Sequence, residues 1–272
     1  MRRFGILAVA ILSQIVVAGV ALADPVDAGK AVGVNPSASN VSGNTTQNLV
    51  VGSDVLMGDK IVTGPTGQVQ LIFNDDTHLV VGPGSALVID KYLLRGKDKS
   101  VSQFAINSLS GTFRFITGKS DHGAYTINTP TGTIGVRGTA FDYLVEPKSK
   151  VVPGFDGRTW VALFRGAVQL CDLQGKCVTL SRQCDLGATS TTDSFTIGKI
   201  LAADGGARNA FPYIVSQRPL LQSFWVPESR FCFIDSSTSK QLPTPLPNTG
   251  PPAGPTIIFN NGGGVCQNNP QC

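Results

Sequence analysis

The sequence has few charges and few histidines. Charged residues make up 15 % of the chain, against about 25 % in an average globular protein. Basic residues exceed acidic ones by only four, and no dense basic run occurs, which argues against nucleic-acid binding. Only two histidines are present, so a histidine-based metal or acid–base site has little support.

Catalytic motifs are missing as well. The segment 117–121 reads Thr-Gly-Lys-Ser-Asp, but a phosphate-binding loop would need a glycine at position 113, where the chain has Phe113. No Gly-x-Ser-x-Gly nucleophile elbow occurs. Residues 50–198 show no convincing amphipathic helix. These absences predict a protein that is not an enzyme and that holds no cofactor and no metal.

The first 23 residues read as a secretory signal peptide. Arg2 and Arg3 precede an apolar run that ends at Ala21-Leu22-Ala23, the small-residue pattern of a cleavage site. The run spans 20 residues, from Phe4 to Ala23, so an uncleaved membrane anchor is the competing interpretation. The small residues at its end favour cleavage. We therefore expect a periplasmic or otherwise exported protein that does not span the membrane after cleavage.

Residues 48–198 read as one strand after another. The segment 68–73 alternates Val69, Leu71 and Phe73 on one face with three other residues, and Asn74-Asp75-Asp76 separates it from the apolar segment 78–81. This pattern predicts a hairpin. Glycine- and proline-rich turns separate further short segments. The predicted fold is all-β, with many short antiparallel strands in a sandwich or a β-solenoid-like stack.

The segments outside this region differ in composition. Residues 24–47 are polar and rich in Ser, Asn, Gly and Thr, and residues 241–272 carry no charge and many prolines and glycines. We expect five parts in this order: signal peptide (1–23), loose lead-in (24–47), β-domain (48–198), irregular extension containing aromatic residues (199–240) and Pro/Gly-rich tail (241–272).

All six cysteines lie in the second half of the chain. An even number in an exported chain predicts disulfides, and the spacings lack the Cys-x2-Cys pairs of structural zinc sites. Cys171 and Cys177 flank a turn at 173–175 and would face each other in a hairpin. The other expected pairs, chosen among several arrangements, are Cys184–Cys232 and Cys266–Cys272.

The stretch 128–141, NTPTGTIGVRGTAF, places Arg137 between two glycines. Two apolar sets around it are out of phase by one residue: Ile134 and Val136, then Phe141, Tyr143 and Val145. Both sets can face one core only if an extra residue is inserted between them. Gly138-Thr139 is the natural place for this β-bulge. Arg137 would then make a structural ion pair or donate to a backbone carbonyl, or else it would contact a ligand.

Several segments resemble the FecR-type periplasmic domain, and the resemblance covers about residues 50–190. They are 58–89, 113–118, 125–145 and 161–170. The most specific part is the motif Thr-Pro…Gly-Val-Arg-Gly-Thr-x-Phe. The resemblance makes its members candidates for structural or ligand-contacting roles: Thr129, Pro130, Gly135, Val136, Arg137, Gly138, Thr139 and Phe141.

The resemblance implies a binding or regulatory protein. The best-known members of the family carry a cytoplasmic anti-sigma domain, a membrane helix and this periplasmic domain, and relay the state of an iron–siderophore transporter to a sigma factor. Here only Met1-Arg2-Arg3 precedes the apolar run, so such a relay would need a membrane-bound partner. We expect a non-enzymatic exported module for binding or scaffolding in the cell envelope, with an envelope protein or a glycan as partner and no nucleic acid. The alternative is a periplasmic component of iron–siderophore signal transduction.

Overall fold

The computed structural model describes residues 26–95, 100–120, 123–146, 157–199 and 209–233. The fold is all-β, as the sequence predicts, and helical turns occur in the described residues only after the last strand. The strands are β1 (Asp27–Asn35), β2 (Ala38–Ser42), β3 (Thr45–Asn48), β4 (Asp54–Leu56), β5 (Lys60–Thr63), β6 (Gln68–Phe73), β7 (His78–Val81), β8 (Ala86–Arg95), β9 (Ser100–Ile116), β10 (Tyr125–Thr129), β11 (Gly132–Glu146), β12 (Arg158–Asp172), β13 (Cys177–Leu180), β14 (Asp185–Thr189) and β15 (Ser194–Lys199). The helical turns are α2 (Pro212–Val215), η1 (Gln222–Phe224) and η2 (Pro227–Phe233).

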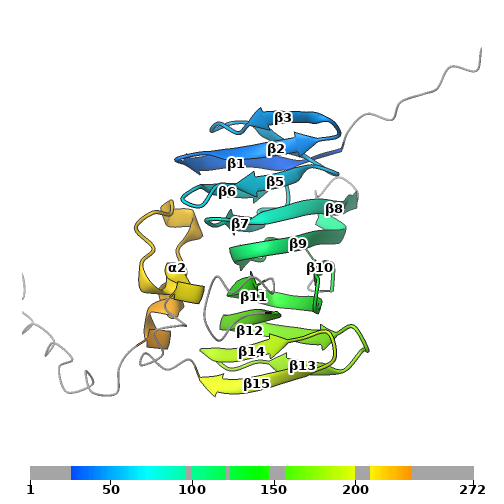
Figure 1. The fold of residues 1–272 in the computed structure, drawn as a ribbon, viewed down its shortest axis with the longest axis vertical. Helices are drawn as coiled ribbons and strands as arrows, with labels where there is room; N and C mark the ends of the chain where they lie inside the picture. Colours follow the sequence, from blue (N-terminus) through cyan, green and yellow to red (C-terminus); the bar gives the residue numbers. More distant parts are fainter. Residues whose placement is uncertain (1–25, 96–99, 121–122, 147–156, 200–208, 234–272) are drawn as a thin grey trace, which may run out of the picture.

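The strands stack along the long axis of the molecule (Figure 1) and form one open sheet folded into two layers. One layer, which we call the covered layer, contains β4, β1, β6, β7, the second part of β9, the second part of β11, the first part of β12, β14 and β15. The open layer contains β3, β2, β5, β8, the first part of β9, β10, the first part of β11, the second part of β12 and β13. Pairing is antiparallel except between β9 and β10.

A single apolar core fills the space between the two layers. Val69, Leu71 and Phe73 of β6 face this core, and β6 pairs with β7 as the predicted hairpin. The open layer contributes residues such as Phe104 to the same buried cluster, and its ring lies 4.8 Å from that of Phe73. The alternation that the sequence predicts for this hairpin is therefore confirmed, and the architecture is a flattened stack with a core between its two walls.

Three long strands pass from one layer to the other at a glycine with positive φ. β9 crosses at Gly111 (φ 102°), β11 at Gly138 (φ 59°) and β12 at Gly166 (φ 78°). In β11 the register with β12 shifts between Arg137 and Ala140. Both apolar sets of this strand lie in the one core cluster, so the predicted bulge is confirmed. Only glycine adopts such angles without a steric penalty from Cβ.

The expected loose lead-in over residues 24–47 is wrong. β1, β2 and β3 occupy most of it, and β1 lies between β4 and β6 in the covered layer. The segment looks like a loop in the sequence because small residues are required there. A Cβ on Gly29 would lie 2.3 Å from the backbone oxygen of Ile72, and Ala28 and Ala31 are fully buried. Tight packing thus replaces the large alternating side chains that usually reveal a strand.

Residues 209–233, here called the strap, lie along the outer side of the covered layer (yellow and orange in Figure 1). Phe211 and Ile214 of the strap join a buried cluster with Trp160 of β12, and Phe224 joins a second cluster with Val80 of β7. The irregular extension is therefore an integral part of the fold over these residues.

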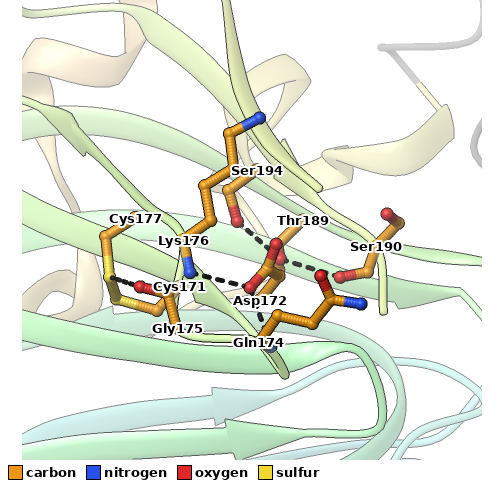
Figure 2. The surroundings of a disulfide bond; sticks show 9 residues. All are labelled: Cys171, Asp172, Gln174, Gly175, Lys176, Cys177, Thr189, Ser190 and Ser194. Atoms are coloured by element: carbon orange, nitrogen blue, oxygen red, sulfur yellow. Dashed lines mark hydrogen bonds between the residues drawn. A yellow bond between two sulfur atoms is a disulfide. The ribbon is translucent and has the colours of Figure 1, made fainter. Parts of the chain in front are cut away.

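Two disulfides are present among the described residues, Cys171–Cys177 and Cys184–Cys232. These are two of the three pairs expected from the sequence, and the third pair lies outside the described residues. Cys171 and Cys177 face each other across the β12–β13 hairpin. Figure 2 shows how Asp172 closes its turn, because Oδ1 accepts the backbone N–H groups of Gln174 and Lys176, both at 2.9 Å. Cys184–Cys232 joins the strap to the turn before β14.

Candidate functional site

The outward side of the open layer, here called the open face, is the candidate site. Strand registers place one row of outward residues across six neighbouring strands: Lys91, Ala105, Thr126, Gly135, Gln169 and Thr179. Apart from Ala105, the members of this row are exposed or half-exposed. The two apolar clusters outside the core both lie on the covered layer. Among the described residues, the open face is therefore the wall that no strap covers.

A second row of polar residues lies beside the first. Asn107 of β9 is opposite Asn128 of β10, and Asn128 is opposite Thr133 of β11. The two asparagines join through Asn128 Nδ2, which donates to Asn107 Oδ1 at 2.8 Å. The remaining amide and hydroxyl groups of these half-exposed residues can bond to a ligand. The open face thus presents a flat array of hydrogen-bonding groups on rigid strands.

Arg137 lies on the open face, next to the bulge in β11. Its side chain is exposed, and it makes no ion pair or hydrogen bond with another described residue. No described residue therefore fills the structural role expected for Arg137, and its ligand-contacting role stays a prediction. Alternation along β11 places Arg137 on the same outward side as Gly135, two residues before it, while Val136 between them faces the core. The guanidinium remains available to a ligand.

The other motif residues have different positions. Gly135 lies in the outward row, and a Cβ there would meet nothing closer than 3.9 Å. Val136 and Phe141 are buried in the core. Thr139 is fixed at the bulge by Thr117, whose N–H and hydroxyl both donate to its carbonyl at 3.0 Å and 3.2 Å. The structure brings Gly135 and Arg137 to one surface and places the apolar members behind it.

Thr129 and Pro130 lie at the turn between β10 and β11, at the edge of the open face. Thr159 Oγ1 donates to Thr129 Oγ1 at 2.9 Å and lies 2.7 Å from Thr131 Oγ1. Pro130 and Thr131 line a cavity of about 310 Å³ together with Glu146. These threonines therefore fix the turn through their hydroxyl groups, and the turn forms one wall of a small cavity.

Residues 59–169, which form most of the open face, match the family model described as FecR protein. The chain contains a FecR domain. In the structure this domain runs from the residue before β5 to Gln169 in β12. It includes Arg137 and most of the open face. It also includes the three glycines at which strands cross between the layers, here called the corner glycines: Gly111, Gly138 and Gly166. β1 to β4, β13 to β15 and the strap flank the FecR domain, and the strands among them continue the same stack.

Two crystal structures, at 1.65 Å and 2.50 Å resolution, of a "putative anti-sigma factor" from Parabacteroides distasonis ATCC 8503 are similar to the chain. Each has a TM-score of 0.39 and 13 % sequence identity, and each match covers 52 % of this chain and 59 % of that one. The chain thus spans less than two thirds of those proteins. No curated protein matches the chain.

The described residues hold neither a metal-binding cluster nor a membrane-spanning helix. They contain no group of three or more His, Cys, Asp or Glu residues that could hold a metal ion. No helix among them has the length and apolar character needed to cross a bilayer. The acidic pair Asp75-Asp76 forms a turn, in which Asp76 N–H donates to the carbonyl of Phe73 at 2.9 Å. Asp75 is buried and accepts hydrogen bonds from Ser120 and Tyr125.

One pair of residues that the sequence did not single out is Arg114 and Asp142. Both side chains are fully buried on the outer side of the covered layer, where the strap encloses them. Each lies between two aromatic residues in the sequence, at a position where strand alternation predicts a solvated side chain. The only sequence signal was therefore an opposite-charge pair on two strands whose pairing was unknown.

Proposed function

We propose that the protein is a non-enzymatic binding module of the cell envelope whose contact surface is the open face around Arg137. The observation that carries this proposal is the difference between the two walls. The strap covers one wall and buries its charges, whereas the other presents two polar rows and an exposed arginine. A flat, rigid polar surface is suited to a macromolecular partner, because rigid strands lose little conformational entropy on binding.

The chemistry of the open face narrows the class of partner. Lys91 and Arg137 are exposed and basic, and the uncharged residues around them offer amide and hydroxyl groups. Arginine binds carboxylate and phosphate groups through two parallel hydrogen bonds. An envelope protein or glycan that presents acidic or carbonyl oxygens would complement this surface. The signal-peptide pattern of residues 1–23 supports export to the periplasm.

The FecR domain supports a role in signal transduction, and this role favours a second candidate function. The protein would then act as a periplasmic component of iron–siderophore signalling, together with a membrane-bound partner that carries the signal inward. Deletion of the gene followed by measurement of siderophore-induced transcription tests this candidate. Unchanged induction would leave the general binding role and remove the iron-specific one.

Site-specific photocrosslinking in cells tests the proposed surface. A photoreactive amino acid at Gln169, in the row beside Arg137, should give a discrete adduct with one envelope component. Arg137→Ala should reduce this adduct, because it removes the exposed guanidinium without disturbing a described contact. Arg165→Ala is the matched control, since Arg165 pairs with Glu228 of the strap. Equal adducts in both variants, or none from Gln169, would contradict the proposal.

A further inference from the structure

We infer that a second, separate site lies at the β3 end of the stack and takes a hydroxyl-rich ligand the size of a saccharide unit. A cavity of about 410 Å³ is present there, lined by residues of β2, β3 and β4 and by Asp59. This volume lies within the range of small-molecule sites, which is about 300–1,000 Å³. The cavity is distinct from the open face and does not include Arg137.

The cavity lies where the space between the two layers reaches the end of the stack. Asn40 of β2 is opposite Gln47 of β3 on one side and Ile61 of β5 on the other. Directly opposed residues point to the same face, and Ile61 belongs to the core. Asn40 and Gln47 therefore continue the core-facing row, but with amides in place of apolar groups. The inward-facing side chains thus change from apolar in β5 to polar in β2 and β3.

Two buried oxygen atoms in this lining have no hydrogen-bond partner among the described residues. Asp59 is 1 % exposed, and its Oδ2 accepts from Asn40 Nδ2 at 2.6 Å and from the backbone N–H of Leu56 at 2.8 Å. Asp59 Oδ1 and Asn40 Oδ1 accept no hydrogen bond from any described residue. The orientation of the Asn40 amide follows from its contact, because a carboxylate oxygen requires the nitrogen to face it. A buried acceptor without a donor is unfavourable.

These two acceptors define the chemistry of the ligand. Each can receive an O–H or N–H group, and neither can donate one. Ser42, Thr45 and Gln47 add hydroxyl and amide groups around them. The charged residues of the lining are Asp54 and Asp59, and Asp54 pairs with Lys30. The cavity therefore favours a ligand that carries several donors and either no charge or a positive charge, and it disfavours an anion.

Three sugars of similar size but different charge test this preference on the full mature chain. Titration calorimetry with glucosamine, glucose and glucuronic acid should show the tightest binding for glucosamine and the weakest for glucuronic acid. The preference for glucosamine over glucose should shrink with added salt, as expected for a charge interaction. Glucuronic acid that binds as well as glucosamine, or no sugar with a Kd below about 10 mM, would overturn the inference.

Two variants connect binding to the cavity. Asp59→Asn keeps the shape of the side chain and one acceptor for the Leu56 N–H, but it turns the unpaired acceptor into a donor. The affinity for glucosamine should therefore fall by about tenfold or more. Gln47→Ala guards against a folding defect in the first variant, because Gln47 is exposed and its side chain bonds to no described residue. It should weaken binding too. Thr46→Ala, on the same strand but outside the lining, is the control and should bind as the wild type does.

A cation in the cavity, or a sugar bound elsewhere on the protein, would each give a different result. A titration with CaCl₂ alone, followed by thermal unfolding, tests for a cation on the same two oxygens. Stabilisation by calcium that Asp59→Asn abolishes, without any sugar binding, would overturn the saccharide assignment. Sugar binding that persists unchanged in all three variants would also overturn it, since the sugar would then bind elsewhere. Failure of these tests leaves the open-face proposal intact, because the two sites share no residue.

Discussion

The guanidinium of Arg114 binds both carboxylate oxygens of Asp142, with Nε 2.7 Å from Oδ1 and Nη2 3.0 Å from Oδ2. The same guanidinium donates through Nη1 to Gln217 Oε1 of the strap at 2.6 Å. Gln217 in turn accepts from the backbone N–H of Val226 at 2.6 Å. The rings of Phe164 and Tyr213 lie beside the arginine. A buried ion pair therefore links two strands of the covered layer to the strap.

Arg114→Ala should destabilise the protein by about 3–5 kcal/mol, because it leaves the carboxylate of Asp142 buried without its partner. Urea unfolding of the full chain measures the change in the free energy of unfolding. The double variant Arg114→Met with Asp142→Leu is the control, since replacing both charges by apolar groups is often close to neutral. A single variant as stable as the double one would show that the carboxylate reaches solvent.

Gly138→Val should destabilise the fold by a few kcal/mol, because a β-branched side chain is forced into the left-handed region at the bulge. Gly166→Ala should act similarly, since its Cβ would lie 2.2 Å from the carbonyl oxygen of Gly138. Gly135→Ala is the matched control in the same strand, because its surroundings are open. Thermal unfolding compares the three variants. If Gly138→Val melts like the wild type while the crosslinked adduct is lost, the motif serves binding alone.

Replacing Cys184 and Cys232 by serine should loosen the strap before the strands unfold. The chain-entropy model gives roughly 4 kcal/mol for a loop of this length. Limited proteolysis should cut the variant within residues 209–233 and leave the strands protected. Loss of all protected fragments would show that the strap is needed for the whole fold. Peptide mapping without reductant tests the expected Cys266–Cys272 pair in the same material.

The four tyrosines should ionise only when the protein unfolds. Burial raises the pKa of the hydroxyl groups of all of them: Tyr92, Tyr125, Tyr143 and Tyr213. A raised pKa in the folded state means that the stability from these groups is fully present below the unfolded pKa of about 10. It is lost as the pH rises above that value. Tyrosinate absorbance and circular dichroism should change together; tyrosinate in a protein with native dichroism would contradict the burial.

Cleavage after Ala23 is the expectation for the N-terminal segment. The Ala-Leu-Ala end of the apolar run is the basis for it. Mass spectrometry of the protein purified from cells should give a mature chain that begins at Asp24. A chain that retains Met1 in the membrane fraction would instead establish the anchor.

Local alternation made part of this structure predictable. Residues 68–81 and the phase change across Gly138 show which side faces the core, so the hairpin and the bulge follow from the sequence. β1 was missed because its close contact with β6 requires glycine and alanine, which resemble a loop in composition. Small residues carry little information about burial when the packing partner is unknown.

The sites were less predictable than the fold for a related reason. Arg114 looked solvated because the strap that buries it comes about a hundred residues later in the chain. Asp59 and Asn40 lie far enough apart that nothing in the sequence pairs them, and only the β2–β5 register brings them together. Arg137 was recognised from its motif, but which side of the sheet stays uncovered depends on where the strap packs. Non-local contacts decide all three cases.

The corner glycines also determine how the molecule can come apart. β9, β11 and β12 each contribute one part to each of the two walls. Neither wall can therefore open without breaking hydrogen bonds in the other. Cooperative units of native-state opening follow such shared elements. Amide exchange in the middle of the stack should therefore proceed through one global event with a common opening free energy, while β3 and β15, each bonded to a single neighbour, exchange by local fraying.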